Sequence, residues 1–239
     1  HIVQRGSLSS QAAQTACYGI FNKIGGESMT AQKEDFWSRF AGTFDNDQRY
    51  IVGEATPKAI LEELSNEQSL GEVVEFGCGS GFFTRALTNN SKSVVATDLS
   101  EEMLEMARRQ FKGIQNITFQ KANCKSTDFP AEAFDTAVMI NLIHVIENPL
   151  YSLLECHRIL KTGGKLVIAS YTAYSMSLLP RIGMIMRFLK KWGKPLPYFN
   201  PKLSPDHLGV LLDKAAFVIE ESKIIGDKTK ALYLRAKKE

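Results

Sequence analysis

Three glycines lie within five positions directly behind a short apolar run in the stretch VVEFGCGSGFF, residues 73–83. The apolar run is typical of a buried strand, and the residues that follow the glycines are typical of a helix. Glycine lets the backbone turn sharply and approach a ligand closely, because it has no Cβ. A strand, a glycine-rich turn and a helix in this order predict a pocket for a nucleotide-like ligand at the tip of the strand.

Strands and helices alternate along the rest of the chain. Five strands are expected at 72–76, 93–98, 116–122, 134–141 and 165–172. Four helices are expected at 83–90, 99–111, 149–160 and near 206–216. Two last strands are expected at 217–225 and 231–238. Such alternation gives a mainly parallel sheet with right-handed crossovers. The predicted fold class is α/β, a doubly wound, Rossmann-like, seven-stranded sheet with an antiparallel C-terminal strand and a helical lid insert.

The length and composition favour one domain. The chain has 239 residues, of which 44% are hydrophobic and 23% charged, a balance typical of globular proteins. Residues 1–28 begin with His1 and are rich in serine. We interpret them as a leader left over from expression, with a transit peptide as the alternative. Residues 29–239 then form one domain, with a helical cap at 29–66, which includes helices at 31–42 and 54–65, and a lid insert at 173–205.

The charge and the cysteines exclude some classes of function. A net charge of +3 is too small to indicate a nucleic-acid partner, and the chain has no RNA- or DNA-binding motif. The four cysteines, Cys17, Cys78, Cys124 and Cys156, form no C-x-x-C pair, which disfavours a metal site and is typical of reduced thiols in a cytoplasmic protein. Apolar runs also stay below the roughly 18 residues that span a membrane.

Two carboxylates accompany the glycine turn. Asp98 ends the second strand, where folds of this kind place the residue that binds the ribose hydroxyls. The glycine spacing is G-x-G-x-G, with Phe82 where the third glycine of the dinucleotide motif belongs. Glu75 would repel a diphosphate and attract a cation. The pattern therefore indicates a nucleoside ligand without a pyrophosphate.

Five segments occur in an order and spacing known from one family: VVEFGCGSGFF, VVATDLSEEML, QKANCKSTDFP, FDTAVMINLIHVIENP and ECHRILKTGGKLVIAS. They resemble the class I S-adenosylmethionine-dependent methyltransferases over about residues 34–239. The layout is most similar to the small-molecule enzymes of quinone biosynthesis and lipid methylation. The resemblance implies transfer of a methyl group from S-adenosylmethionine, by in-line displacement, to a small acceptor that is lipophilic in one interpretation, with S-adenosylhomocysteine as the product.

The resemblance also implies a set of cofactor-binding residues. They are Glu75, Gly77, Cys78, Gly79, Gly81, Asp98, Leu99, Met103, Asn123, Cys124 and Asn141. In the family, Glu75, the glycines and Asn141 would surround the methionyl part, and Asp98 would bind the ribose. Leu99 and Met103 would pack on the adenine, with Cys124 near the purine. Asn123 stands where the family usually has aspartate, but an amide oxygen also accepts a hydrogen bond from the adenine amino group.

The sequence indicates less clearly which residues contact the methyl acceptor. His144 follows the fourth strand and is the candidate catalytic residue, either as a general base or as a residue that orients the acceptor. The alternative is a packed histidine. Tyr171 and Tyr174 either contact the acceptor or fill space. Phe40 and Phe44 resemble a segment that closes over the cofactor. In-line displacement requires alignment more than acid–base catalysis.

The insert at 173–205 contains no acidic residue and six basic ones, Arg181, Arg187, Lys190, Lys191, Lys194 and Lys202. On an ideal helix, one apolar stripe is formed by Leu178, Ile182, Ile185, Leu189 and Trp192, while most of the basic residues fall on the opposite side. We expect this apolar stripe to pack on the domain. Two alternatives are a greasy acceptor pocket under the helix and contact of residues 177–194 with an anionic membrane surface.

Two other functions remain open at this point. One is a protein that binds S-adenosylmethionine without catalysis, and the other is a nicotinamide-dependent oxidoreductase. The absent third glycine disfavours the oxidoreductase. The sequence gives no indication of the oligomeric state.

Overall fold

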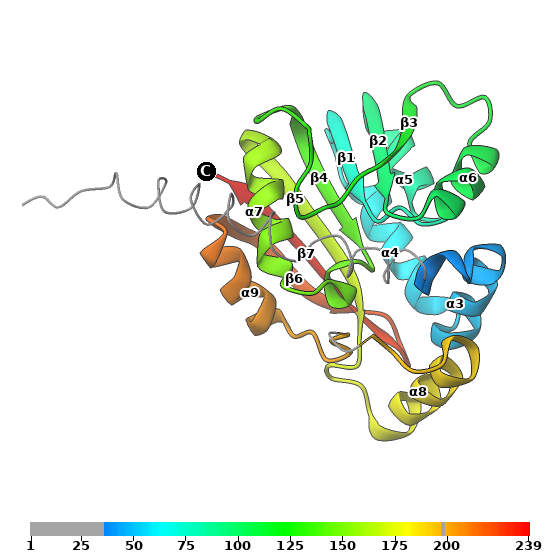
Figure 1. Ribbon diagram of the computed structural model, residues 1–239. Helices are drawn as coiled ribbons and strands as arrows, with labels where there is room; N and C mark the ends of the chain where they lie inside the picture. Colours follow the sequence, from blue (N-terminus) through cyan, green and yellow to red (C-terminus); the bar gives the residue numbers. More distant parts are fainter. Residues whose placement is uncertain (1–35, 197–198) are drawn as a thin grey trace, which may run out of the picture.

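A computed structural model describes residues 36–196 and 199–239. Its seven-stranded sheet has the order β3-β2-β1-β4-β5-β7-β6 (Figure 1). The strands are β1 (Glu72–Phe76), β2 (Ser93–Asp98), β3 (Ile117–Lys121), β4 (Phe134–Ile140), β5 (Leu160–Thr172), β6 (Phe217–Ile225) and β7 (Lys230–Lys238). The α-helices are α3 (Phe44–Val52), α4 (Ala55–Asn66), α5 (Thr84–Asn90), α6 (Glu101–Gln110), α7 (Pro149–Ile159), α8 (Leu178–Trp192) and α9 (Pro205–Lys214).

The sheet confirms the predicted fold class. Strand β1 pairs in parallel with β2 and with β4, and the parallel pairing continues to β3 on one side and to β5 on the other. Strand β7 is antiparallel to both of its neighbours, β5 and β6. The reversal comes from the short β6–β7 connection, because a tight connection joins only antiparallel strands.

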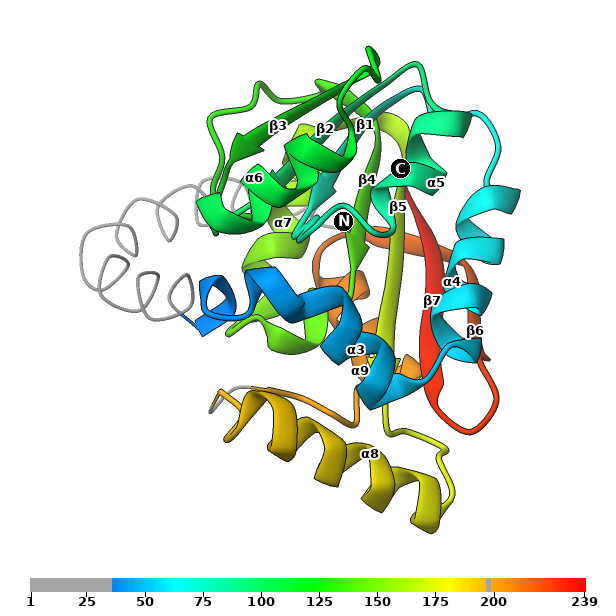
Figure 2. The same ribbon diagram turned by 90° about the vertical axis from the view of Figure 1, so that its right-hand side faces the viewer.

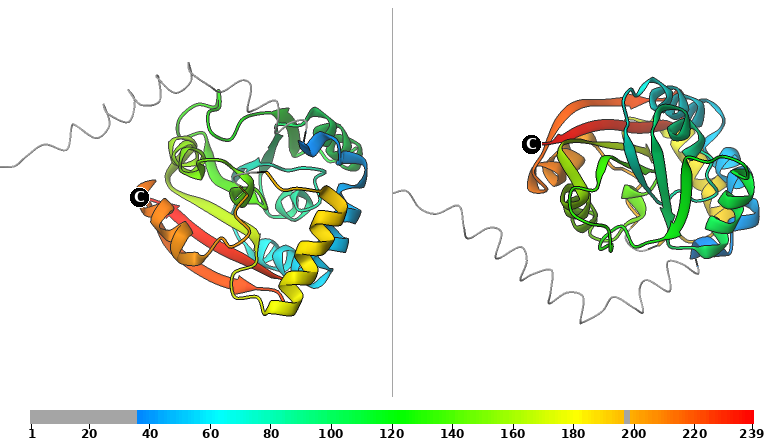
Figure 3. Two further views of the ribbon diagram at one scale, coloured as in Figure 1. Left: turned by 60° about the horizontal axis from the view of Figure 1, so that its bottom comes forward. Right: turned by 90° about the horizontal axis from the view of Figure 1, so that it is seen from above.

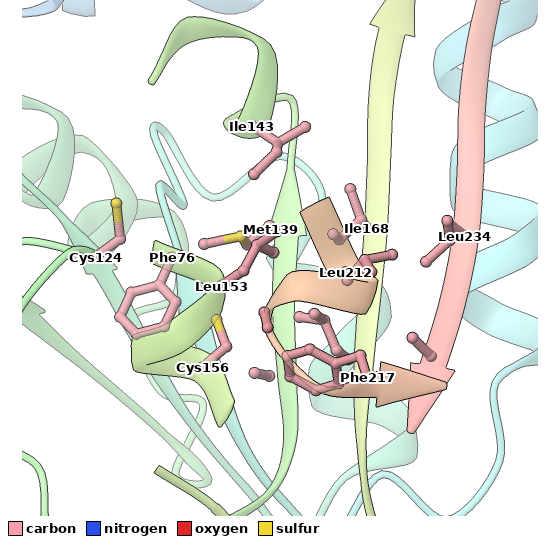
Figure 4. Close-up of a cluster of buried hydrophobic side chains, with 14 of the residues drawn as sticks. Phe76, Cys124, Met139, Ile143, Leu153, Cys156, Ile168, Leu212, Phe217 and Leu234 are labelled. Carbon is pink, nitrogen blue, oxygen red and sulfur yellow. The ribbon is translucent and has the colours of Figure 1, made fainter. Parts of the chain in front are cut away.

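Two hydrophobic clusters, one on each face of the sheet, form the core. The first lies between the sheet and α7 and α9, and Figure 4 shows members such as Met139, Leu153 and Leu212. The second lies under α4, α5 and α6. In β4, Met139 points to the first cluster and Val138 to the second. The continuous apolar run at 134–141 therefore reflects burial on both faces, as expected for a central parallel strand.

Two element boundaries differ from those expected. Strand β5 begins at Leu160 and runs through both glycines that were expected to separate it from the preceding helix. Leu160 pairs with Phe134, and the register shifts before Thr136, so the strand absorbs the glycines as an irregularity. At the N-terminal side, residues 36–38 are helical, a 3-10 turn (η1, Ala41–Thr43) follows, and α3 was not expected.

Helix α3 carries its own signals, which the periodicity of apolar residues did not show. Asp45 and Asp47 lie in its first turn, where the helix dipole stabilises acidic groups. Thr43 precedes the helix and donates a hydrogen bond to Asp47 (2.7 Å). Gly53 ends the helix with a positive φ of 79°. These end signals define a helix even though its apolar stripe is short.

Helix α8 is present at the expected place, but the expected packing is wrong. Arg187 donates to the carbonyl of Ile51 (3.0 Å) and Lys191 forms an ion pair with Asp47 (2.7 Å), so the basic side faces α3. The apolar stripe faces outward, except for Trp192 at its end, which stacks on Phe44. The reason is electrostatic, because Asp47 is buried under α8 and a buried carboxylate needs a charged partner.

The predicted leader, residues 1–28, and residues 29–35 of the predicted cap lie outside the described residues. The division of the chain into a leader and a single domain with cap and lid therefore stays a prediction. Over the described ranges, every helix is too short or too polar to cross a bilayer.

Candidate cofactor and active site

The candidate site lies at the topological switch point of the sheet, between β1 and β4, where the order in which the chain adds strands reverses. The chain winds from β1 to β2 and β3 on one side, and β4 and β5 lie on the other side of β1. Gly77, Asp98 and Asn141 follow or end β1, β2 and β4, so all three lie at the carboxyl edge of the sheet. Ligands of doubly wound proteins bind at this position, outside the carboxyl ends of strands that diverge. The fold and this edge define an α/β protein with a nucleotide-type crevice.

The glycine turn has one packed side and one open side. A Cβ on Gly81 would lie 2.7 Å from the ring of Phe111, and one on Gly77 would lie 2.8 Å from Leu142. A Cβ on Gly79 would meet only the ring of Phe44, at 3.8 Å. Gly79 also has a positive φ of 54°, which favours glycine. The backbone at Gly79 is therefore where a ligand can approach most closely.

Asp98 ties the glycine turn to the tip of β2. One carboxylate oxygen accepts a hydrogen bond from the backbone N–H of Gly79 (2.9 Å). The other accepts from the backbone N–H of Ser100 (2.9 Å). A second tie runs from the N–H of Cys78 to the carbonyl of Thr97 (2.9 Å). These bonds hold the carboxylate at the edge of the crevice and fix the shape of the turn before a ligand binds.

Glu75 lies beneath the turn and is 1% exposed. Burial raises its pKa to about 7, a hydrogen bond donated by Thr84 (2.6 Å) opposes this shift, and the nearby charge of Asp98 adds to it. Near neutral pH the carboxyl group is therefore divided between its neutral and ionised forms. A cationic ligand group would favour the ionised form, because opposite charges attract strongly in a buried site.

The residues expected on the adenine side lie in the loop after β2, in the first turn of α6 and in the loop after β3. Ser100 caps α6 by accepting from the N–H of Met103 (3.2 Å). Met103 is buried and Leu99 is half-buried. The side-chain oxygen of Asn123 accepts a hydrogen bond from the backbone N–H of Lys125 (3.1 Å), so this amide has a local partner.

The two buried cysteines in the set belong to the core by their side chains. The thiol of Cys124 lies 3.3 Å from the Ser152 hydroxyl, and Cys124 belongs to the same cluster as Phe76 (Figure 4). The thiol of Cys78 packs in the other cluster, and burial raises its pKa well above the usual value. The Cys78 thiol therefore stays protonated at neutral pH.

Asn141 is held in an unusual conformation at the end of β4. Its φ is positive (55°), and its side-chain oxygen accepts from the backbone N–H of Tyr171 (2.9 Å). Its Nδ2 atom and the Tyr171 hydroxyl are buried close to each other, and among the described residues neither has a hydrogen-bond partner of good geometry. Strained backbone and unsatisfied buried polar atoms are costly, and they concentrate at functional sites.

His144 lies in η2 (Ile143–Val145), directly after β4, and is 7% exposed. Its Nδ1 lies 2.6 Å from the hydroxyl of Ser170, and its ring packs edge-on against Phe199. Burial lowers its pKa to about 4, so the imidazole is neutral at pH 7. Its position at the rim fits a role in orienting the acceptor, whereas Tyr174 is largely exposed.

The cap crosses the glycine turn through contacts that the sequence did not indicate. The hydroxyl of Ser80 donates to Asp45 of α3. Ser38 forms a hydrogen bond with Ser100 (2.8 Å), the residue that caps α6. Neither pair has a spacing or motif that could have predicted it, since the partners are 35 and 62 positions apart.

Aromatic side chains from the cap and from α8 meet beside the turn. Trp37, Phe40 and Phe44 all contact Trp192, with ring centroids 5.5–6.2 Å apart. The row continues from Trp192 to Phe188, Phe199 and His144. The indole N–H of Trp192 is a third buried donor without a partner in the described chain. The space beside the glycine turn is therefore bounded by flat apolar surfaces.

Replacing Gly79 with alanine is expected to lower the affinity for S-adenosylhomocysteine by about tenfold, because the new methyl group lies on the side where a ligand approaches. The positive φ should also lower the free energy of unfolding by about 1–2 kcal/mol. Gly163→Ala is the matched control, since Gly163 also has a positive φ (79°) but lies at the far end of β5. Calorimetric titration and thermal unfolding separate the two effects, and equal affinity in both variants would contradict the assignment.

Comparison with known proteins finds its matches in the part of the chain that contains the candidate site. Residues 74–168 match the family model of the methyltransferase domain. The demethylmenaquinone methyltransferase of Tropheryma whipplei is 30% identical over 118 residues, which are 49% of this chain and 49% of that protein. The ubiquinone/menaquinone biosynthesis C-methyltransferase of Proteus mirabilis is 25% identical over 199 residues, 75% of this chain and 79% of that protein.

The solved structure of a SAM-dependent methyltransferase from Thermotoga maritima has the same fold, with a TM-score of 0.65 and 23% identity over 86% of this chain and 99% of that one. The glycine turn, Asp98 and Asn141 all lie inside the matched domain. Over these residues the chain is similar to proteins named methyltransferases, in agreement with the family that its sequence motifs resemble. It spans about half the length of the curated relatives that it matches first.

Proposed function

We propose that the protein transfers a methyl group from S-adenosylmethionine to a small, lipophilic, quinone-like acceptor. The observation that carries this proposal is the glycine turn, which Asp98 ties to β2 above the buried Glu75. The names of the relatives support the acceptor class, since two of them are demethylmenaquinone and ubiquinone/menaquinone methyltransferases.

The residues at the crevice fit a nucleoside with a cationic amino-acid end. The open side of Gly79 admits the ligand, and Asp98 is placed to accept hydrogen bonds from ribose hydroxyls. Glu75 ionises readily beside a cation, and the Asn141 amide still has a donor to offer. When bound, the cofactor supplies an electrophilic methyl group on a sulfonium.

The chain's contribution to the reaction is alignment and exclusion of water. The aromatic row from Trp37 to Phe199 offers flat apolar walls, which suit an aromatic ring better than a charged acceptor. The buried indole N–H of Trp192 and the hydroxyl of Tyr171 are donors that an acceptor oxygen would satisfy. A neutral His144 would orient the acceptor through its imidazole ring, since burial disfavours the protonated form.

Two measurements test the proposal. Isothermal titration should show binding of S-adenosylhomocysteine, and a methyl-transfer assay should show methylation of a hydroquinone by S-adenosylmethionine. Binding without transfer to any quinone-like acceptor would favour a non-catalytic binding protein. Tight binding of NADH without binding of S-adenosylhomocysteine would favour an oxidoreductase. A cytoplasmic location stays a prediction, and contact of residues 177–194 with a membrane stays a proposal that the exposed face of α8 supports.

Replacing His144 with asparagine is expected to slow methyl transfer by about tenfold and to leave the affinity for S-adenosylhomocysteine nearly unchanged, because the residue lies on the acceptor side. Since its pKa is about 4, the rate should show no step from this group between pH 6 and pH 8. His157→Asn is the control, because His157 is also partly buried but packs on Phe217 beneath the sheet. An unchanged rate in His144→Asn would contradict a role in methyl transfer and would favour the alternative of a packed histidine.

A further inference from the structure

Helix α8 presents an apolar surface that nothing in the described chain covers. We call this surface the outer face of α8, and its members are Leu178, Leu179, Ile182, Ile185, Met186 and Leu189. Each is between 43% and 79% exposed, and α8 has no residue in the buried class. Elsewhere in the described residues, large exposed hydrophobic side chains occur singly or in a small group at Val210, Val218 and Ile219, whereas these six lie together on one helix. Contiguous patches of this kind mark interaction surfaces.

The opposite side of α8 already has its partners. Arg187 and Lys191 bind α3, and Trp192 packs among the aromatic residues of the cap. Successive residues of a helix are rotated by about 100°, so Arg187 and Lys191 lie opposite the outer face and Trp192 lies beside it. Figures 2 and 3 show α8 at the edge of the molecule, next to α3 and away from the sheet. The helix is therefore fixed in an orientation that turns its apolar side outward.

The charged side chains of the segment that carries α8 have one sign. Residues 173–205 contain no acidic side chain, and Arg187 and Lys191 are engaged with α3. Lys190 and Lys194 remain exposed beside the apolar side chains. An apolar stripe bordered by lysine and arginine is the pattern of helices that lie in the interface of an anionic bilayer. A second copy of the chain would bring like charges together at the same place, which disfavours a dimer through this face.

We propose that the outer face of α8 binds the surface of an anionic lipid bilayer, with the helix parallel to the membrane plane. Fifteen residues make a helix about 22 Å long, which is shorter than the roughly 30 Å hydrocarbon layer. The six apolar side chains enter the boundary between headgroups and acyl chains, and Lys190 and Lys194 contact anionic headgroups. This interaction goes beyond methyl transfer and does not depend on it.

Sedimentation of the full chain with vesicles tests the proposal. Vesicles of phosphatidylcholine with phosphatidylglycerol should bind the protein, and vesicles of phosphatidylcholine alone should bind it more weakly. Ile182→Gln combined with Met186→Gln should lower the partition coefficient by about tenfold. Lys190→Gln and Lys194→Gln should lower it by about fivefold each, and less at high salt. The matched control, Val210→Gln combined with Val218→Gln, changes exposed valines of α9 and β6 and should bind like the unchanged chain.

The same preparations are measured for thermal unfolding, S-adenosylhomocysteine affinity and molar mass. Unchanged unfolding and cofactor affinity in the α8 variants, with loss of vesicle binding, supports the proposal. Failure of the unchanged protein to bind anionic vesicles overturns it, as does binding that survives the α8 substitutions. A dimer that dissociates in the Ile182 and Met186 variant also overturns it, in favour of a second copy of the chain on this face.

Discussion

Replacement of Glu75 by glutamine is expected to weaken the binding of S-adenosylhomocysteine on the order of 100-fold, and to make the unliganded protein more stable above pH 7. The loss of affinity follows from the buried position of the carboxyl group, because a ligand ammonium that loses a buried ionic partner keeps its desolvation cost. The gain in stability follows from the pKa of Glu75, which burial raises from 4.5 to about 7.

The raised pKa of Glu75 makes the free energy of unfolding depend on pH. A carboxyl group whose pKa is higher in the folded state than in the unfolded state stabilises the fold below the unfolded pKa. This contribution, about 3 kcal/mol, is lost as the pH rises from 4.5 to about 7. Glu75→Gln has no titrating group at this position, so its free energy of unfolding should not fall for this reason as the pH rises from 4.5 to about 7. Cofactor affinity in the unchanged protein should rise with pH up to about 7, because binding favours the ionised form and releases a proton.

Glu72→Gln is the control for this experiment. Glu72 lies on the same strand, but its side chain is at the surface, where Lys92 and Lys161 bind it. The same chemical change there should alter neither the affinity nor the stability above pH 7 by a comparable amount. Calorimetric titration from pH 5 to pH 8 and thermal unfolding of the unliganded proteins give both readouts. An unchanged affinity in Glu75→Gln would exclude a direct role of this carboxylate in binding.

Replacement of Asp98 by alanine is expected to lower the affinity for S-adenosylhomocysteine by about 1–3 kcal/mol, which is up to about 100-fold, the scale of hydrogen bonds to a charged group. Two effects contribute. The ribose loses an acceptor, and the glycine turn loses the bond from the N–H of Gly79 that shapes it.

Asp135→Ala separates these effects from a general loss of stability. Asp135 lies near the start of β4, and its carboxylate accepts a backbone hydrogen bond from Glu72 (2.8 Å), much as Asp98 does from Gly79. It lies at the opposite edge of the sheet, so its loss should lower the thermal stability and leave the affinity intact. If both variants lost affinity equally, the ribose assignment of Asp98 would be wrong.

The strands and helices that build the sheet were largely predictable from the sequence. Runs such as 93–98 and 217–225 have local periodicities that agree with their final state, so the predicted bounds coincide with β2 and β6. The glycine turn and Asp98 were found for a similar reason, because their spacing along the chain is itself the geometry of a strand–turn–helix unit. Helix α3 was missed because its signals lie in its ends and its apolar stripe is short.

The orientation of α8 and the closing of the cap were decided only by the tertiary structure. The pattern of 178–192 defines a helix with an apolar side, but hydrophobicity alone assigns that side to the interior. The Ile51 carbonyl binds Arg187 and the Asp47 carboxylate binds Lys191, each pair more than 130 positions apart in the sequence. These contacts orient the basic side of the helix toward α3 and its apolar side outward. Contacts between distant residues, such as Ser80 with Asp45, depend on where the whole fold places each partner. The sequence by itself therefore determined the order of elements and the turn at the strand tip, because these depend on neighbouring residues. Which face of the insert is covered, and how the cap closes over the crevice, depends on partners that only the folded chain brings together.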